Sequence, residues 1–200
     1  MGFLLKLSHA IDRTSHVVGK SIIWLILAAT LISALNAIAR KAFNIGSNAF
    51  LEIQWYLYAA VFMLGAGHAF MQNAHVRIDV LANRLSLRTR MLIDIGGIVI
   101  FLLPLCFLVI QLSWPVVVNA YNSGEMSSNA GGLLRWPVFA LAPLGFALLG
   151  LQGISELIKR LAFLAGRAPD PFLAGGHGAP SSESETGTTD DAAKHGEVRK

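Results

Sequence analysis

Four long stretches of the chain contain no Asp, Glu, Lys or Arg residue. They are residues 21–39, 53–71, 95–118 and 136–155. A helix rises about 1.5 Å per residue, so each stretch is long enough to cross a hydrocarbon core of about 30 Å. Helices are favoured over strands because the apolar runs are continuous rather than alternating. The sequence therefore predicts an all-α integral membrane protein with four transmembrane helices.

The composition supports a lipid environment. Hydrophobic residues make up 54% of the chain and charged residues only 14%, whereas soluble domains carry roughly 25% charged residues. The net charge is +4, but the basic residues flank apolar stretches and form no stripe interleaved with aromatic residues, so nucleic acid is not a predicted partner. The single cysteine, Cys106, lies within an apolar stretch, so the chain has no internal disulfide and no Cys-based metal cluster.

The Lys and Arg residues outside the four stretches predict the orientation of the chain. Those before the first stretch, between the second and third, and after the fourth are Lys6, Arg13, Lys20, Arg77, Arg84, Arg88, Arg90, Lys159, Arg160 and Arg167. The other two connections contain only Arg40, Lys41 and Arg135. Basic residues accumulate on the cytoplasmic side of a membrane. We therefore expect a multi-pass protein of a bacterial inner membrane with both termini in the cytoplasm.

The first 20 residues form a region of their own in the sequence. Apolar residues such as Leu4, Leu7 and Ile11 recur there at helical spacing, opposite basic residues. This pattern predicts an N-terminal amphipathic interfacial helix over residues 1–20. The apolar stretch that follows is longer than the core of a cleavable signal peptide, so we expect an uncleaved anchor.

The remaining boundaries follow from capping and composition. The four spans define a membrane domain at residues 21–160, and Ser86 is expected to cap the helix that becomes the third span. Residues 168–200 are rich in Pro, Gly, Ser, Thr and acidic residues and contain one Phe. A segment of that composition cannot bury enough apolar surface to fold, so we predict a disordered acidic tail.

Titratable side chains are few within the apolar stretches, and His68 is the clearest functional candidate. We expect it several turns inside the second span, where an ionisable group is costly. A plainer interpretation is a neutral histidine that hydrogen-bonds to a neighbouring helix. His9 and His16 are seven residues apart, as are His68 and His75, so a membrane haem or electron-transfer subunit is the alternative function. Haem ligation needs facing imidazoles at similar depth, whereas His75 lies beyond the span. We expect no catalytic residue, no cofactor and no metal ligand, and hence no enzyme.

One passage of the sequence resembles a known family. Residues 52–81 read EIQWYLYAAVFMLGAGHAFMQNAHVRIDVL and contain the skeleton E-x-x-x-Y…H-V-R-x-D-x-L. This passage resembles the small permease subunit of tripartite ATP-independent periplasmic (TRAP) transporters, the DctQ family. The resemblance covers about residues 10–165. Leu87 stands where members of the family often have Pro, a departure that affects only the start of the third span.

The resemblance implies one membrane component of a three-part importer. A periplasmic solute-binding protein would deliver a small organic solute, expected to be a carboxylate, and a large permease subunit would carry it by using an ion gradient. The small subunit would brace the large one within the lipid. Substrate and ion sites belong to the large subunit in this family, so no catalytic or transport residue is assigned to this chain.

Five residues are candidates for structural or partner contacts: Glu52, His68, His75, Arg77 and Asp79. Glu52 begins the second span, where a helix N-terminus favours an anion, so it is either a satisfied surface carboxylate or the partner of a cation on another subunit. We expect His75, Arg77 and Asp79 to fix the elbow after the second span. Small residues in the second span would let a partner helix approach closely; they are Ala59, Ala60, Gly65, Ala66, Gly67 and Ala69.

Overall fold

The computed structural model describes residues 2–43, 48–72 and 86–166. His75, Arg77, Asp79 and the predicted tail lie outside the described residues. The helices are α1 (Gly2–Phe43), α2 (Asn48–Met71), α4 (Leu87–Gly97), the π-helical segment η1 (Ile98–Leu102), α5 (Leu103–Ser123) and α6 (Trp136–Leu164). Four helices are long and apolar enough to cross a membrane, with α4, η1 and α5 forming the third. The predicted all-α membrane fold is confirmed, and each predicted span lies within one of these helices.

The first helix continues through the boundary that we expected at residue 20. Helix α1 runs unbroken from Gly2 to Phe43. The segment contains no proline, and Gly19 in its interior keeps the helical conformation. Its 42 residues would extend about 63 Å, roughly twice the thickness of a hydrocarbon core. The N-terminal half therefore continues the helix of the first span without a break at residue 20. Phe3 and Leu7 on this half are exposed, which leaves its apolar face available to the bilayer.

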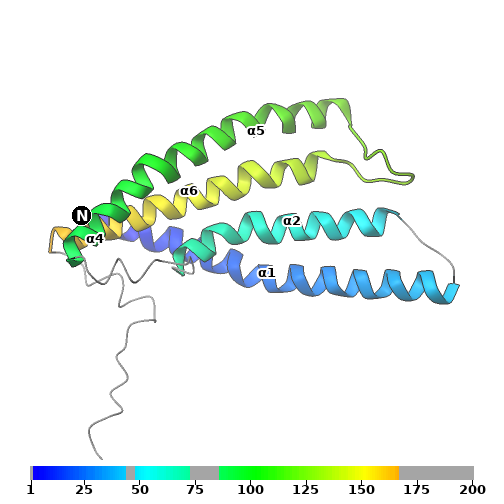
Figure 1. The fold of residues 1–200 in the computed structure, drawn as a ribbon, viewed down its shortest axis with the longest axis horizontal. Coiled ribbons are helices and arrows are strands. Elements are labelled where there is room, and N and C mark those ends of the chain that lie inside the picture. Colours follow the sequence, from blue (N-terminus) through cyan, green and yellow to red (C-terminus); the bar gives the residue numbers. More distant parts are fainter. Residues whose placement is uncertain (1, 44–47, 73–85, 167–200) are drawn as a thin grey trace, which may run out of the picture.

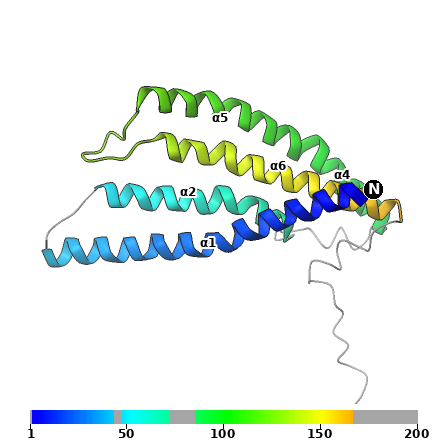
Figure 2. The same ribbon diagram turned by 180° about the vertical axis from the view of Figure 1, so that it is seen from behind.

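The four long helices form a layer rather than a closed bundle. Helices α1, α2, α6 and α5 lie side by side in that order (Figure 1). The N-terminal half of α1 also crosses against α6 at one end of the layer (Figure 2). Helix α6 consequently contacts α1, α2 and α5, and it is the most buried of the four. The last helix in the sequence is thus the centre of the packing.

Glycines in α6 permit these close contacts. A Cβ atom added at Gly145 would lie 2.5 Å from the Met63 carbonyl oxygen of α2, and one added at Gly153 would lie 2.6 Å from Leu102 of η1. Small residues that let two backbones approach are the usual means of packing helices in lipid. Helix α6 therefore uses different glycines to contact neighbours on its two sides.

The small residues of α2 serve contacts within the chain. A Cβ atom at Gly67 would lie 3.3 Å from the Leu148 carbonyl oxygen of α6, and one at Gly65 would lie 3.2 Å from Ile22 of α1. We had expected this set to receive a helix of another subunit, and for these two glycines that expectation is wrong. The physical reason is that α2 lies between α1 and α6, so the helix faces that carry these small residues are already covered by the chain itself.

The third crossing begins and ends at recognisable caps. The Ser86 hydroxyl accepts a hydrogen bond from the Thr89 backbone amide at 3.3 Å, which confirms the predicted N-cap. The wider turns of η1 precede Pro104, whose missing N–H disrupts the regular helical ladder. The helix then continues past Pro115 to Gly124, whose φ of 61° ends it in the left-handed conformation.

Candidate functional site

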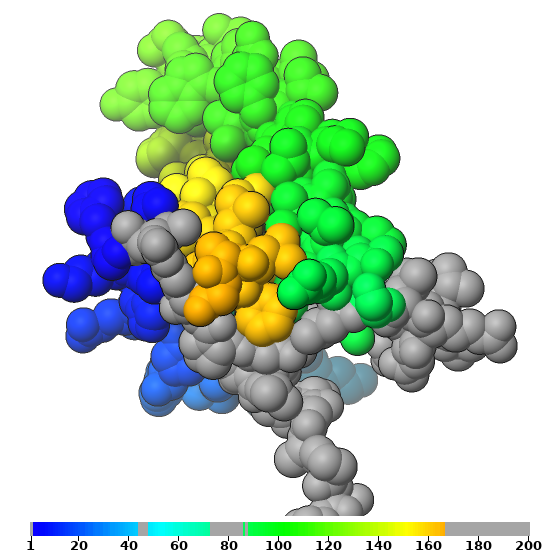
Figure 3. Space-filling view, turned by 90° about the vertical axis from the view of Figure 1, so that its left-hand side faces the viewer, coloured from blue at the N-terminus to red at the C-terminus, as the bar shows by residue number. Residues whose placement is uncertain are grey.

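The start of α1 and the end of α6 lie close together at the end of the layer where the chain begins (Figure 3). Polar side chains of the two helices meet there. The Ser15 hydroxyl donates to Oε1 of Gln152 at 2.6 Å, and the Ser8 hydroxyl lies 2.7 Å from that of Ser155. Between these contacts, Oδ1 of Asp12 accepts hydrogen bonds from Gln152 Nε2 and Ser155 Oγ, each at 2.9 Å. Five polar side chains thus satisfy one another along the α1–α6 contact.

Ion pairs extend this network towards α4. Lys159 Nζ lies 2.7 Å from Asp12 Oδ2 and 2.8 Å from Glu156 Oε1. Arg160 NH1 lies 2.8 Å from Glu156 Oε2, and its Nε lies 3.4 Å from Asp94 Oδ2. The Glu156 and Arg160 side chains are only 6% and 4% exposed. Positive and negative groups alternate from α1 through α6 to α4, and we call this set of ion pairs, together with its hydrogen bonds, the α1–α6 clasp.

The electrostatics of the clasp favour its charged forms. Asp12 and Lys159 both lie outside the charge-free stretches of their helices. Burial alone would raise the pKa of Asp12, but hydrogen bonds from Lys159, Gln152 and Ser155 outweigh it and hold that pKa below its usual value. Burial alone would lower the pKa of Lys159, yet its bonds to Asp12 and Glu156 raise it. Both groups therefore favour their ionised forms, and the attraction between them offsets the desolvation of this part-buried pair.

The α1–α6 clasp was not predicted from the sequence. Asp12 was not singled out in the sequence, and Lys159 and Arg160 were used only as markers of orientation. A signal was present: Ser8, Asp12 and Ser15 recur at spacings of four and three. Residues at that spacing share one helix face, and α6 carries a matching series at Gln152, Ser155, Glu156 and Lys159.

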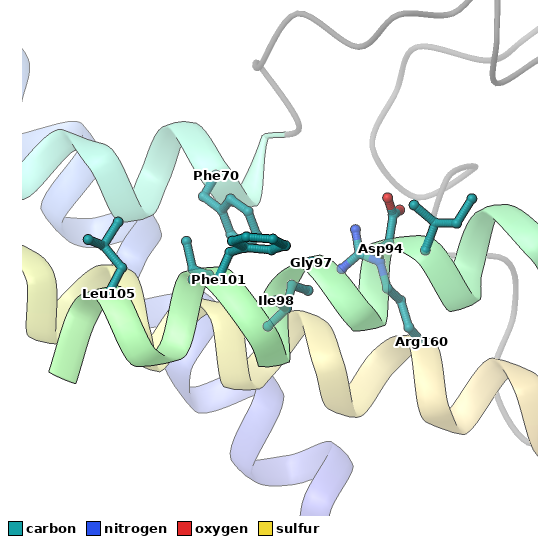
Figure 4. Close-up of a pocket in the computed structure, with 9 residues that line it drawn as sticks. Phe70, Asp94, Gly97, Ile98, Phe101, Leu105 and Arg160 are labelled. Carbon is teal, nitrogen blue, oxygen red and sulfur yellow. Dashed lines mark ion pairs between the residues drawn. The ribbon is translucent and has the colours of Figure 1, made fainter. Parts of the chain in front are cut away.

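A cavity of about 430 Å³ lies beside the clasp. Its walls are mainly apolar and come from the ends of α2, η1 and α5, including Phe70, Ile98 and Phe101 (Figure 4). Asp94 and Arg160 lie at one end of it. These two polar residues belong to the clasp, and among the described residues no group of three or more His, Cys, Asp or Glu side chains could hold a metal ion.

Glu52 holds the loop at the opposite end of the layer. Its carboxylate accepts hydrogen bonds from the Ser127 hydroxyl, from Asn129 Nδ2 at 2.7 Å and from the Leu133 backbone amide at 2.7 Å. One turn later, the Tyr56 hydroxyl donates to the Leu134 carbonyl oxygen at 3.0 Å. Of the two interpretations of Glu52, the structure supports the satisfied carboxylate, because the donors come from its own chain.

The same donors set the ionisation of Glu52. The residue precedes the apolar stretch at 53–71. Hydrogen bonds from the Ser127 hydroxyl, the Leu133 amide and the Asn129 side chain hold the pKa of Glu52 below its usual value. Carboxylates that accept several hydrogen bonds favour the charged form. A negative charge on α2 is therefore a stable anchor for the loop between α5 and α6.

His68 lies nearer the end of its helix than we expected. It occupies the last turn of α2, not a position several turns inside the span. Its ring centroid lies 5.9 Å from that of His16, and the ring packs where a Cβ atom at Gly19 would clash at 2.4 Å. Its Nε2 is 3.4 Å from Nε2 of Gln72, the residue that directly follows α2, while its buried Nδ1 has no partner among the described residues. His68 contacts the neighbouring helix through packing and not through the predicted hydrogen bond.

The candidate residues do not form one site. Glu52 and His68 lie near opposite ends of α2, about 24 Å apart along the helix axis. The ion pairs that join different helices in the described residues lie at the end formed by Asp12, Asp94 and Arg160. The geometry therefore describes a membrane scaffold that is fixed at both ends, and it brings together no catalytic group of side chains among the described residues.

Four apolar spans, held together by polar contacts at their ends, define a multi-pass membrane protein. Residues 29–163 match the model of the DctQ component of tripartite ATP-independent periplasmic transporters, and the chain belongs to this family. It is similar to a Haemophilus influenzae protein that carries the provisional name TRAP transporter small permease protein. The two are 29% identical over 160 residues, which cover 80% of this chain and 94% of that relative.

No solved structure matches the chain. The family match identifies a transporter component, so the membrane haem subunit suggested by the histidine spacings is not favoured. Membership in the family implies association with a large permease and a solute-binding protein in general terms. The recognition of the family from the passage at residues 52–81 is confirmed.

Proposed function

We propose that this chain braces the large permease subunit of a TRAP transporter while that subunit imports a small organic carboxylate. A periplasmic binding protein would deliver the solute, and an ion gradient would drive its uptake. The observation that supports this role most directly is the arrangement of α1, α2, α6 and α5 in a layer (Figure 1). A layer one helix thick presents broad apolar faces to a larger partner.

The same arrangement argues against transport by this chain alone. Secondary transporters commonly bind their substrate near the bilayer midplane, between discontinuous helices. The ion pairs between helices described here lie at the ends of the spans, and Pro143 is accommodated within a continuous α6. A layer of unbroken helices has no second layer with which to enclose an anion and its coupling ion.

Contacts that hold the helices together at both ends of the layer are suited to a rigid subunit. The α1–α6 clasp joins the first and last spans at one end, and Glu52 fixes the outer loop to α2 at the other. A carrier that moves its substrate site across the membrane needs surrounding protein that does not move with it. The small subunit would widen that fixed frame.

The orientation of the chain follows the distribution of basic residues. The start of α1 and the end of α6 lie at the same end of the layer (Figure 2), which agrees with four crossings. We place that end in the cytoplasm of the cell because most Lys and Arg residues lie there. His75, Arg77 and Asp79 would then shape the cytoplasmic elbow that follows α2. If so, Arg77→Ala should lower the yield of the complex and leave its apparent substrate affinity unchanged, whereas a selective change in affinity would contradict the assignment.

Reconstitution tests the proposed role. Proteoliposomes would contain this chain alone, the large subunit alone or both, each with solute-loaded binding protein and an imposed sodium gradient. We expect uptake only when both membrane subunits are present. Collapse of the gradient with an ionophore provides the matched control. Uptake by this chain alone would overturn the accessory role, and full uptake by the large subunit alone would overturn the bracing role.

A further inference from the structure

An amide side chain is exposed within the third span. Gln111 of α5 lies inside the charge-free stretch at 95–118, seven residues before Val118, which corresponds to about 10 Å along the helix. Its side chain is exposed and has no hydrogen-bond partner among the described residues. Lipid chains offer no hydrogen bonds, so a polar group at this depth is expected to find a protein partner.

A backbone carbonyl in the same turn of α5 lacks its usual helical donor. Pro115 is inside the helix four residues after Gln111. Proline has no N–H, so the backbone carbonyl of Gln111 loses its usual helical donor. The amide and the carbonyl of one residue are therefore both available at the same depth. Backbone groups freed by proline in membrane helices are commonly satisfied by a neighbouring helix.

These groups lie on the side of α5 that faces away from the rest of the chain. Cys106 and Ala120 are buried, and Cys106 contacts Gly150 of α6. At spacings of three and four residues, Phe107, Gln111, Pro115 and Val118 form a separate stripe, and all four are exposed. We call this stripe the outer face of α5. Helix α5 forms one edge of the layer (Figure 1), so the outer face is open along its length.

We infer that the outer face of α5 binds a transmembrane helix of the large permease subunit, and that this helix presents a hydrogen-bonding side chain such as Asn, Gln, Ser or Thr at the depth of Gln111. Helices associate in lipid through close packing and such interhelical hydrogen bonds. The inference rests on the proposed function, because it names the surface by which the small subunit would brace the large one.

The shape of α5 favours the large subunit over a second copy of this chain. The helix bows away from α6, so its outer face is convex (Figures 1 and 2). Two copies related by a two-fold axis would present the same convex surface to each other. Such surfaces touch over a short length only. A different protein can provide a surface that follows the curve and reaches the whole stripe.

Photocrosslinking locates the partner. Benzoylphenylalanine would replace Phe107 or Val118 on the outer face, with Leu35 on the exposed side of α1 as the matched control. Cells would express the full chain together with a tagged large subunit. We expect crosslinks to the large subunit from positions 107 and 118 and none from position 35. Crosslinks to a second copy of this chain, or to the large subunit from position 35 alone, would overturn the inference.

A substitution tests the hydrogen bond itself. Gln111→Leu makes the span more apolar, so insertion and the yield of the small subunit should be unchanged. The amount of large subunit that copurifies should fall by about threefold or more, as expected for the loss of one interhelical hydrogen bond in a membrane. Leu112→Met, at an exposed position beside Gln111, should have no effect.

The outcomes separate this inference from the proposed function. If the wild-type chain recovers the large subunit and Gln111→Leu recovers it equally well, the inference about the outer face is wrong and the accessory role remains. If the wild-type chain does not recover the large subunit under any mild detergent, both the inference and the proposed function are wrong.

Discussion

Asp12 Oδ2 lies 2.7 Å from Lys159 Nζ, and this ion pair joins the first and last helices of the described chain. The two residues are brought together by helices that run side by side beyond the charge-free stretches. Because Gln152 and Ser155 also donate to Asp12, the pair belongs to a hydrogen-bonded network. Such a network is worth more than an isolated surface ion pair.

Asp12→Ala should therefore destabilise the protein. The substitution leaves Lys159 with one carboxylate and removes the acceptor for Gln152 and Ser155, so we expect a loss of about 1 to 2 kcal/mol. Thermal unfolding in detergent provides the measurement. Arg13→Ala, at the next and exposed position, is the control and should change stability by less than about 0.5 kcal/mol. Equal effects of the two substitutions would show that the clasp is not stabilising.

Gly145→Ala should disrupt the contact between α6 and α2. The new Cβ atom would lie 2.5 Å from the Met63 carbonyl oxygen, so the two backbones must separate. Overpacking of this kind costs about 1 to 3 kcal/mol, to be measured as a lower midpoint of thermal unfolding. At Gly96, where nothing lies within 4 Å of an added Cβ, alanine should be neutral or slightly stabilising because it favours helix. A harmless Gly145→Ala would contradict the close approach of α2 and α6.

Glu52→Gln should loosen the loop between α5 and α6. Glutamine keeps the shape of the side chain but turns one acceptor into a donor, which would face the Leu133 amide or the Asn129 side chain. Hydrogen exchange at the Leu133 amide should become faster. Glu125→Gln is the control, because Glu125 forms an exposed pair with Arg135 and should matter little for that amide. Unchanged hydrogen exchange at the Leu133 amide in Glu52→Gln would show that the Glu52 carboxylate does not hold the loop.

The effect of acid on this loop has a definite direction. The pKa of Glu52 is lowered from the ordinary value of 4.5, so folding favours its charged form. Its contribution is complete above that ordinary value and is lost as the pH falls through the lowered pKa. Protection of the Leu133 amide, corrected for intrinsic exchange, should hold from neutral pH down to that value and decrease only below it. Loss of protection near neutral pH would point to a different group.

The orientation of the chain can be measured with single cysteines. In a Cys106→Ser background, Ser128→Cys should react with an impermeant reagent added to the periplasmic side, since it lies in the exposed loop held by Glu52. Ser86→Cys, at the other end of the helices, should react only after the membrane is made permeable. The opposite pattern would show that the basic residues mislead about the orientation.

The sequence predicted the spans well because apolar content is a local property. Each charge-free stretch became part of one helix, and Ser86 was identified as a cap from its position before Leu87 and the helix that follows. The packing order of the helices depends instead on which faces meet. Periodicity alone does not say that Gly67 contacts α6, or that Asp12 is held by α6 rather than by solvent. The depth of His68 was misjudged although the predicted span and α2 both end at Met71. The residue is only three positions before that end and so lies in the final turn.

The central position of α6 sets the order in which the protein can assemble. Helices enter the membrane as the chain is made, and α1 and α2 can pair as soon as both have entered. Helix α5 has its long contact with α6 and not with the helix made before it (Figure 1). Helix α5 can therefore make this contact only after the last span has been synthesised. A chain that stops before Trp136 would contain one helix pair and one unattached helix, so the four-helix layer can form only after α6 has entered the membrane.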